Sequence, residues 1–572
     1  MMLSEGMPTA PFGLLDWSIV AAYFIITTVV AALLTGKQAT IRDFFLGGRK
    51  LPWWAVSGSI VAAEISAVTF IAVPGISYAR GGDLTYLQLG IGAIIARLIV
   101  GLFFVPRYYE QEIYSPYDFM GNQLGPRVRT ATTLLFFVGG TLGQGARILV
   151  TSVLLQVVAG IDVYSAIACL GAFGIAWSFI GGITTVVWTD VAQFVILVVG
   201  AVAALIFAVY SVDGGLDEVL HLARDKEKLR VFELGSDLSL NYTLLVGLLC
   251  TPFLNVAAFG VDQSIAQRMF CCKTPRQASL AIYASCIGQG IAVLMLLVGV
   301  AIYAYFVHNP PTSEEQAAMA TEGARVLPLY IIRAMPPGLR GLLVAAIFAA
   351  SMSSSAIMAL SQSTLAAFKQ PVLKVVRAAG WRGRAPGDVL LSRGLIVFWG
   401  IVLSLVAIVC IPVRESYPNA IDLVLSIVAY TYGPLLGIFL LAFLPFHRDD
   451  RGLLWAVPLG MLAVFGLTVH AGWLELGWPA MHLNLSDVIV WTGAGVTLVL
   501  AILRFRDDLG RIATVTVGVL VIVILHRFQL GLDELDRPVY PSPYWAYPVG
   551  TLMTLFVGWG LGNKVGKRRN PV

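Results

Sequence analysis

Long apolar segments recur along the whole chain, and they restrict its fold more than any other feature of the sequence. A helix needs about 20 residues to cross a hydrocarbon core of about 30 Å. Hydrophobic residues make up 58% of the chain and charged residues only 12%, which is about half the charged share of a soluble domain. We therefore predict an all-α integral membrane protein. The fifteen predicted helices span approximately residues 15–36, 51–79, 83–106, 131–159, 162–180, 190–212, 241–265, 279–307, 339–368, 391–412, 420–442, 453–471, 487–504, 511–528 and 545–561.

The distribution of basic residues predicts the orientation of these helices. With the N-terminus outside, 25 of the 38 Lys and Arg residues fall in cytoplasmic loops and 11 in outer segments, while Arg97 and Arg147 lie inside helices. Basic loops resist translocation, so this bias favours an outer N-terminus and a cytoplasmic C-terminus. The first residues lack the pattern of a cleaved signal peptide. We expect a multi-pass protein of the cell membrane, specifically a bacterial inner membrane.

Several classes of function are disfavoured by what the sequence lacks. The predicted outer loops 213–240 and 308–338 are too short for a separate catalytic domain, and the six cysteines have no metal-site or redox spacing. No nucleophile–base pair or phosphate-binding loop is recognisable, so we expect no enzymatic activity. The net charge of +5 follows from the cytoplasmic loops and does not indicate a nucleic-acid partner. The basic stretch 369–393 is expected to face anionic lipid.

Polar residues interrupt two of the apolar helices. The first interruption contains Glu64, Ser66 and Thr69, followed by Pro74 and Gly75, and the second is the serine-rich run 349–355. Such groups are costly at mid-membrane unless they meet partners, water or a ligand. Serines in membrane helices can also bond back to their own helix. Broken helices at the midplane are nevertheless where many transporters bind ions and substrates, so the pattern favours a transporter.

Four motifs resemble those of the sodium:solute symporter family, which includes sodium-galactose, proline, iodide, monocarboxylate and sialic-acid carriers. The resemblance covers roughly residues 15–445, and its motifs occupy residues 43–49, 181–193, 262–268 and 432–437. It implies a fold of the leucine-transporter type, built from two inverted five-helix repeats. We expect these repeats at 51–212 and 241–445, separated by the outer loop 213–240. An extra helix lies within 1–50, and additional helices occupy 446–572.

The resemblance also implies a sodium site between the two interrupted helices. Carbonyl groups of Ala62, Ile65 and Ala350 and hydroxyl groups of Ser353 and Ser354 match the family's ligands. Some members hold a second sodium near a carboxylate that corresponds to Asp190. Ala356 and Ile357 replace the hydroxyls of that second site, so we expect one sodium per cycle. Asp190 is read either as a coupling group or as a carboxylate stabilised near a helix N-terminus.

For the solute, the resemblance implies a binding site that differs from that of the sugar carriers. Positions that bind substrate in the sugar carriers hold Gln88, Ala258 and Gln289 here, which argues against a galactose site. Ser66, Thr69 and Gln88 match substrate-contacting positions of the sialic-acid carrier, and Asn255 matches a substrate-facing position of the sugar carriers.

Each charged residue inside the helices has more than one possible role. Arg147 is either a bidentate clamp for a substrate carboxylate, or a structural cation that pairs with Glu64 or reaches toward a membrane face. Glu64 is a counter-charge, a protonatable coupling group or part of the solute site. Arg97 is interpreted as a structural residue or as one that reaches toward a membrane face.

Together these features predict a sodium-coupled symporter that imports a small organic solute by alternating access. A carboxylate such as a monocarboxylate or a sialic acid is the favoured solute. A sugar or other neutral solute, proton coupling through Glu64 or Asp190, and a transporter-like sensor are the alternatives.

Overall fold

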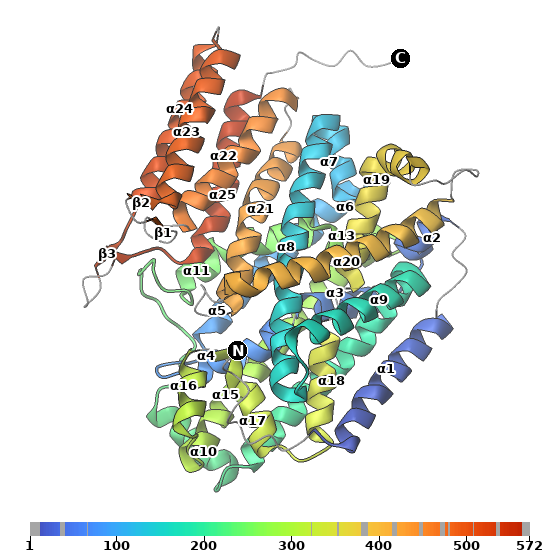
Figure 1. Ribbon diagram of the computed structural model, residues 1–572, viewed down its shortest axis with the longest axis vertical. Helices are drawn as coiled ribbons and strands as arrows, with labels where there is room; N and C mark the ends of the chain where they lie inside the picture. The colour runs from blue at the N-terminus through green and yellow to red at the C-terminus, as the bar shows by residue number, and fades with distance from the viewer. Residues whose placement is uncertain are drawn as a thin grey trace.

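A computed structural model shows a molecule built almost entirely of helices (Figure 1). Two short hairpins, β1–β2 and β3–β4, are the strands of its described part. The structure describes residues 12–34, 40–65, 67–111, 113–321, 323–351, 354–378, 387–414, 420–444, 450–468, 475–478, 481–506, 508–532 and 538–562.

The elements follow one another along the chain in the order given below. The first half contains α1 (Leu14–Leu34), α2 (Ile41–Leu46), η1 (Gly47–Arg49), α3 (Trp53–Glu64), α4 (Ala67–Tyr78), η2 (Thr85–Leu87), α5 (Gln88–Ile99), η3 (Val100–Phe104), α6 (Val105–Glu110), α7 (Pro116–Leu124), α8 (Pro126–Ala159), α9 (Val163–Tyr210), α10 (Gly215–Asp225), α11 (Leu244–Leu249), α12 (Thr251–Val256), η4 (Ala257–Val261), α13 (Gln263–Met269), α14 (Pro275–Ala284) and η5 (Ser285–Gly288). The second half contains α15 (Gln289–His308), α16 (Ser313–Thr321), η6 (Gly323–Arg325), α17 (Val326–Ala334), α18 (Leu339–Ser351), α19 (Ser354–Ala378), α20 (Asp388–Arg414), α21 (Ala420–Phe443), α22 (Asp450–Thr468), β1 (Glu475–Trp478), β2 (Met481–Asn484), α23 (Leu485–Arg504), α24 (Leu509–Arg527), β3 (Gly531–Leu532), β4 (Pro538–Val539), η7 (Pro543–Trp545) and α25 (Ala546–Leu561).

The fifteen predicted helices all fall on helices of the structure. Among the described residues, seven helices are long and apolar enough to cross a membrane, and the bent pair α3–α4 makes an eighth. One of the seven, α9, contains two of the predicted helices. The two segments expected to be outer loops differ from the prediction, because they contain α10, α16 and α17. These helices are short, and α10 carries charged residues in its first and last turns, so they lack the long apolar run that marks a membrane helix.

The first predicted break in a helix is present between α3 and α4. The two parts, Trp53–Glu64 and Thr69–Tyr78, meet at 59°. Ile65 ends α3 in an extended conformation, with φ −77° and ψ 90°. Carbonyls in the last turn of a helix have no intrahelical donor, so this break leaves backbone oxygens available for a ligand.

A second break, within α9, depends on a glycine of the family-like motif. Gly182 has φ 58° and ψ −157°, a conformation that L side chains rarely adopt. A Cβ at this position would also lie 2.6 Å from the Phe44 carbonyl oxygen of α2. Gly182 therefore permits both the break in α9 and its close contact with α2.

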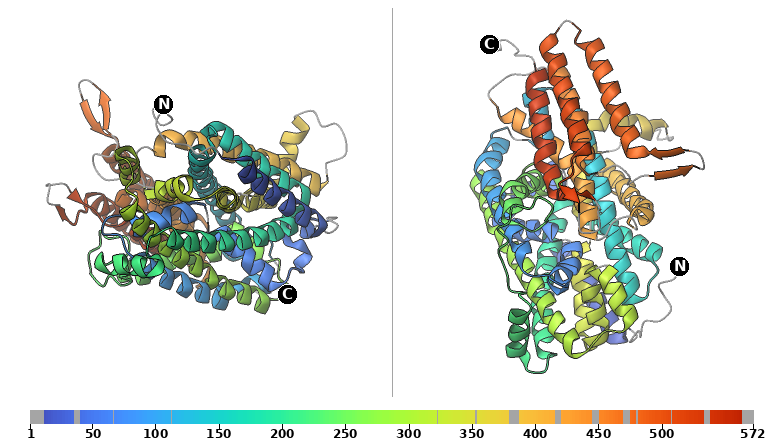
Figure 2. Two further views of the ribbon diagram at one scale, coloured as in Figure 1. Left: turned by 90° about the horizontal axis from the view of Figure 1, so that it is seen from below. Right: turned by 90° about the vertical axis from the view of Figure 1, so that its left-hand side faces the viewer.

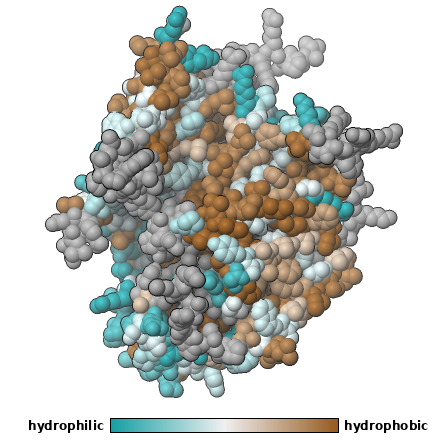
Figure 3. All heavy atoms as spheres, in the orientation of Figure 1, coloured by the Kyte–Doolittle hydropathy of each residue, from teal (hydrophilic) through white to brown (hydrophobic). Residues whose placement is uncertain are grey.

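Apolar side chains cover much of the outer surface. Figure 3 shows hydrophobic side chains over the face formed by α9 and α20 and hydrophilic ones gathered at the end near α10 and α16. Exposed residues of α20 include Phe398, Ile401 and Leu405. An apolar band of this kind is stable only against lipid or a partner, which agrees with a membrane-spanning protein.

The C-terminal helices form a group of their own at one end of the molecule (Figure 2). Within this group, α25 packs closely against α21 (Figure 1). A Cβ on Gly433 of α21 would lie 3.1 Å from the Gly550 Cα of α25, and the Thr551 hydroxyl donates to the Gly433 carbonyl at 3.0 Å. Close contact without intervening side chains is typical of tightly associated membrane helices. The additional helices are therefore fixed to α21.

Candidate functional site

A cavity of about 180 Å³ lies where the broken pair α3–α4 meets α5, α8, α12 and α15. Its volume is below the range of about 300 to 1,000 Å³ that is usual for drug-sized ligands, so it suits a small solute. Its lining combines charged, amide and hydroxyl groups with an apolar portion. The lining residues are Glu64, Thr69, Tyr86, Leu89, Gly90, Ala93, Arg147, Thr251, Leu254, Asn255, Gln289, Val424 and Tyr544.

The Glu64 carboxylate in this cavity is held by Arg97. The fully buried Arg97 guanidinium forms an ion pair with Glu64 and also donates to the Ser285 hydroxyl at 3.0 Å. It lies 4.1 Å from the centre of the Phe259 ring, and the Gln289 amide donates to Glu64 at 3.1 Å. The interpretation of Arg97 as a structural residue agrees with this geometry. The suggested pairing of Glu64 with Arg147 is wrong for this structure, because Glu64 is engaged by Arg97.

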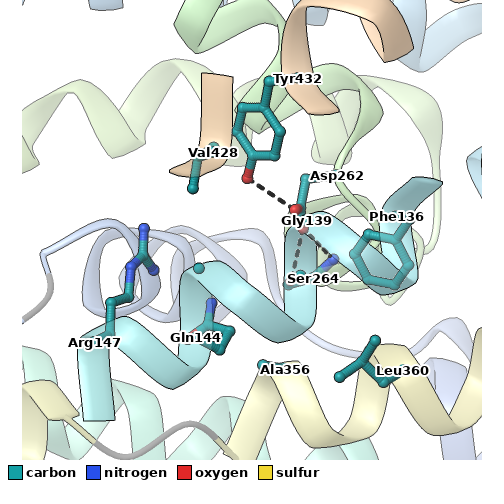
Figure 4. A pocket seen from close by; sticks show the side chains of 12 residues that line it. Phe136, Gly139, Gln144, Arg147, Asp262, Ser264, Ala356, Leu360, Val428 and Tyr432 are labelled. Carbon is teal, nitrogen blue, oxygen red and sulfur yellow. Dashed lines mark hydrogen bonds between the residues drawn. The ribbon is translucent and has the colours of Figure 1, made fainter. Parts of the chain in front are cut away.

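Arg147 lies half-buried on α8 and lines two cavities. The second cavity has a volume of about 20 Å³ and is lined by residues of α8, α13, α19 and α21, which leaves room for about one water molecule. Among the described side chains, none forms a hydrogen bond or ion pair with the Arg147 guanidinium. Figure 4 shows Arg147 and Gln144 extending from α8 beneath Val428 of α21. Arg147 is thus placed to meet an anion in the first, larger cavity.

On the far side of the second cavity, a hydrogen bond connects α21 to the start of α13. The Tyr432 hydroxyl of α21 donates to the Asp262 carboxylate at 2.8 Å (Figure 4). Asp262 also caps α13, accepting from the Ser264 backbone at 2.7 Å. One carboxylate therefore fixes the start of α13 and its contact with α21.

Asp190 lies outside both cavities, in a buried cluster. Arg268 of α13 donates to its carboxylate at 2.8 Å, and the Ser59 hydroxyl of α3 donates at 2.5 Å. All three side chains are buried. Asp190 of α9 therefore connects to α13 through the permanently charged Arg268 and to α3 through Ser59. The position of Asp190 in the sequence did not indicate this structural role.

The structure brings together four of the predicted solute residues. Glu64, Thr69, Arg147 and Asn255 line the first cavity. Gln88 is buried beside it, with its amide donating to the Tyr242 carbonyl at 3.0 Å and accepting from the Glu233 backbone at 3.2 Å. Ser66 lies outside the described residues. Tyr86 and Tyr544 line the cavity but were missed, because nothing in their sequence surroundings sets them apart.

The predicted sodium ligands lie in two regions of the chain. Ala62 and Ile65 are buried at the end of α3, and Ala350 belongs to α18, whose last described residue is Ser351. Ser353 and the side chain of Ser354 lie outside the described part of the chain. Terminal carbonyls are oxygen donors, which hard cations prefer. The carbonyls at the end of α3 are thus chemically suited to sodium.

Comparison with known proteins decides the family. The profile of the Sodium:solute symporter family matches residues 44–460. The chain belongs to this family. It is therefore a multi-pass membrane transporter that couples movement of a solute to sodium, and the sequence-based prediction of the family and of sodium coupling is confirmed.

Individual relatives in the family carry chemically different solutes. The chain is 28% identical to sodium-coupled monocarboxylate transporter 2 of Bos taurus, over 81% of this chain and 74% of the relative. It is also 28% identical to the sodium/sialic acid symporter SiaT of Proteus mirabilis (strain HI4320), over 79% of this chain and 89% of the relative. The human sodium/iodide cotransporter is 27% identical over 80% of this chain and 71% of its own length. All three relatives are named for anionic solutes.

A solved structure shows that the fold is shared. The substrate-bound, outward-open state of a Na⁺-coupled sialic acid symporter superposes with a TM-score of 0.72 at 20% identity, covering 97% of this chain and all of the other. At this identity the likeness concerns the fold and leaves the solute undetermined.

Proposed function

We propose that this family member imports a small organic anion together with sodium, and that a short monocarboxylate is its solute. The observation that carries this proposal is the cation in the cavity: Arg147 lines it, while the charge of Glu64 is engaged by Arg97. A planar guanidinium can bind a carboxylate through two hydrogen bonds. The volume of about 180 Å³ favours a monocarboxylate over the larger sialic acids.

The proposed cycle uses the break between α3 and α4 and the serine-rich run 349–355. Sodium would bind first, between the end of α3 and the start of α19, with Ala62, Ile65, Ala350, Ser353 and Ser354 as its ligands. It would hold the broken helix in the conformation that forms the solute cavity. Such coupling is reciprocal, so the factor by which sodium raises solute affinity equals the factor by which solute raises sodium affinity.

One sodium per cycle is the proposed stoichiometry. Arg268 and Ser59 already bind the Asp190 carboxylate, so a second cation there would have to displace a buried guanidinium. Breaking a buried ion pair is costly. Ala356 and Ile357 add no hydroxyl oxygen nearby.

The inverted repeats are proposed to comprise residues 51–212 and 241–445. Each then begins with an interrupted helix: α3–α4 in the first, and α11–α12 with the π-helix η4 in the second. The matched span of the family, 44–460, encloses both proposed repeats and leaves α23, α24 and α25 outside.

The decisive experiment compares an acid with its neutral amide. Proteoliposomes with an inward sodium gradient are given L-lactate or lactamide, with sodium replaced by choline in the control. We expect sodium-dependent uptake of lactate alone. Arg147→Gln should raise the KM for lactate by about 10- to 150-fold, the factor equivalent to a hydrogen bond to a charged group of about 1.5 to 3 kcal/mol.

Arg147→Lys is the matched control, because it keeps the charge but loses the planar fork. Its KM should lie between those of the wild type and Arg147→Gln. Uptake of lactate with unchanged KM by a well-folded Arg147→Gln protein would exclude the clamp. Sodium-driven uptake of lactamide in preference to lactate would indicate a neutral solute instead.

A further inference from the structure

The C-terminal helices contribute a side chain to the solute cavity. Tyr544, in the short helix η7 directly before α25, lines the cavity together with residues of α3, α5, α8 and α12. It lies well beyond residue 460, where the match to the family profile ends. The lining of the cavity therefore includes a residue that lies outside the region matched by the family profile.

The backbone around Tyr544 is fixed on both sides. Before it, Ser542 donates its backbone N–H to the Leu238 carbonyl at 2.8 Å and its hydroxyl to Asn241 at 2.7 Å. After it, α25 is held against α21 by the Gly433–Gly550 contact and the hydrogen bond from Thr551. Tyr544 thus has a defined position relative to both the 213–240 segment and α21.

The Tyr544 ring belongs to the apolar portion of the lining. It is only 4% exposed and packs in a cluster with Leu89, Val246 and Cys250. Leu89 lines the cavity too, as do Tyr86 and Leu254, which pack against the same cluster. A carboxylate bound at Arg147 would direct the rest of its molecule into the space that these side chains leave.

We infer that Tyr544 is a specificity-determining residue that contacts the apolar part of the solute and limits its length. The identity of that solute as a monocarboxylate rests on the proposed function above. The ring forms a wall of fixed position, so a tail longer than the space beside it collides with the phenol. An apolar pocket discriminates one additional or missing methylene group by about 10- to 200-fold.

The test compares a short and a long acid in the same proteoliposomes. Sodium-driven uptake of L-lactate and of hexanoate is measured for wild type, Tyr544→Phe and Tyr544→Ala. We expect Tyr544→Ala to shift the ratio of kcat/KM by about 10-fold or more toward hexanoate. Tyr544→Phe retains the ring and should keep the wild-type ratio. Tyr540→Ala, on the same segment but outside the cavity lining, is the matched control and should also keep it.

A purely structural role for Tyr544 predicts a different result. Loss of packing alone would reduce uptake of both acids by the same factor and leave the ratio unchanged. That outcome would overturn the inference while leaving the proposed function intact.

A second measurement does not depend on which solute is carried. Tyr544→Cys and Tyr547→Cys are treated with a small, membrane-impermeant methanethiosulfonate, and labelling is followed by mass spectrometry of the peptide. Tyr547 is 1% exposed and lies in the packed cluster with Ala429 and Val464, so its cysteine should react slowly. The cysteine at 544 should react several times faster.

The two measurements distinguish failure of the proposed function from failure of the inference about Tyr544. Absence of lactate and hexanoate uptake by the wild type would refute the proposed function, and faster labelling at 544 would still place it in the cavity. Equal labelling rates at 544 and 547 would refute the inference, whatever the solute.

Discussion

The Glu64 carboxylate and the two arginines determine the charge of the solute cavity. Arg97 is fully buried and bound to Glu64, Ser285 and the Ala93 carbonyl. Burying a guanidinium without a partner is very unfavourable, so Glu64 is required as an anion next to it. The pair is electrically neutral as a unit. Arg147 therefore adds a positive charge to the cavity, which favours an anionic solute.

This arrangement predicts which substitution damages folding. Arg97→Gln should lower the free energy of unfolding by about 3 kcal/mol or more, because Glu64 then remains partly buried without its counter-ion. The double variant Arg97→Gln with Glu64→Gln should recover part of that loss. Thermal unfolding in detergent measures both. Arg147→Gln is the control and should unfold near the wild-type temperature; a loss equal to that of Arg97→Gln would contradict the assignment of partners.

Sequence reasoning found the charged residues of the cavity but not their pairing. Glu64, Arg97 and Arg147 stand out because ionisable groups are rare in apolar helices. Their partners depend on how α3, α5 and α8 face one another, and the spacing along the chain does not contain that information. The same applies to Arg268, whose partner Asp190 lies on α9, 78 residues away in sequence.

At the scale of elements, the ends of the broken helices are where the chain departs from regular structure. The break after Glu64 was predictable, since polar residues interrupt an apolar run there. The way in which α4 ends was not. Lys228, a buried residue of the 213–240 segment, donates to the carbonyls of Ser77, Tyr78, Ala79 and Gly82 at 2.8 to 3.3 Å. A cation at a helix C-terminus satisfies free carbonyls and stabilises the helix dipole.

Lys228 makes stability depend on pH in a defined direction. Burial lowers its pKa from 10.5 to about 8, partly offset by Asp83. Between these values the unfolded chain binds more protons than the folded one, so the contribution of Lys228 to the free energy of unfolding rises from pH 8 to pH 10.5. Below pH 8 this contribution is constant. The unfolding temperature of wild type minus that of Lys228→Met should increase over this range; a decrease would contradict the sign.

The proposed sodium site leads to a prediction for Ser354, the first described residue of α19. Because the proposed site uses the hydroxyl of Ser354, Ser354→Ala should raise the sodium concentration needed for half-maximal uptake much more than the KM for solute at saturating sodium. One site also predicts a Hill coefficient near one for sodium. Uptake measured against sodium concentration tests both, with Ser351→Ala as the control outside the proposed ligand set. A coefficient near two would require a second ion.

At the scale of the whole molecule, the length and composition of the apolar segments predicted fifteen helices that all fall on helices of the structure, and family motifs predicted the fold. The short helices α10, α16 and α17 were not predicted because they lack a long apolar run. The contribution of the C-terminal helices to the cavity was not predicted either. It results from packing between α25 and α21, which are more than 100 residues apart in sequence.

The orientation in the membrane that the distribution of charge predicts can be tested at opposite ends of the molecule. Figure 1 places α10, which begins the 213–240 segment, far from the end of α19. Ser392 would be an unsuitable labelling site because it is buried and bound to the Asp388 carbonyl. Lys374 of α19 is exposed, as is Ser236.

In intact cells an impermeant maleimide should label Ser236→Cys, because the 213–240 segment is expected to lie outside. Basic loops remain in the cytoplasm, so the basic stretch 369–393 would be protected. Lys374→Cys should react only after the membrane is permeabilised. Labelling of the protein without these substitutions gives the background from native cysteines, of which Cys169 is exposed. The reverse labelling pattern at the two introduced cysteines would invert the proposed topology.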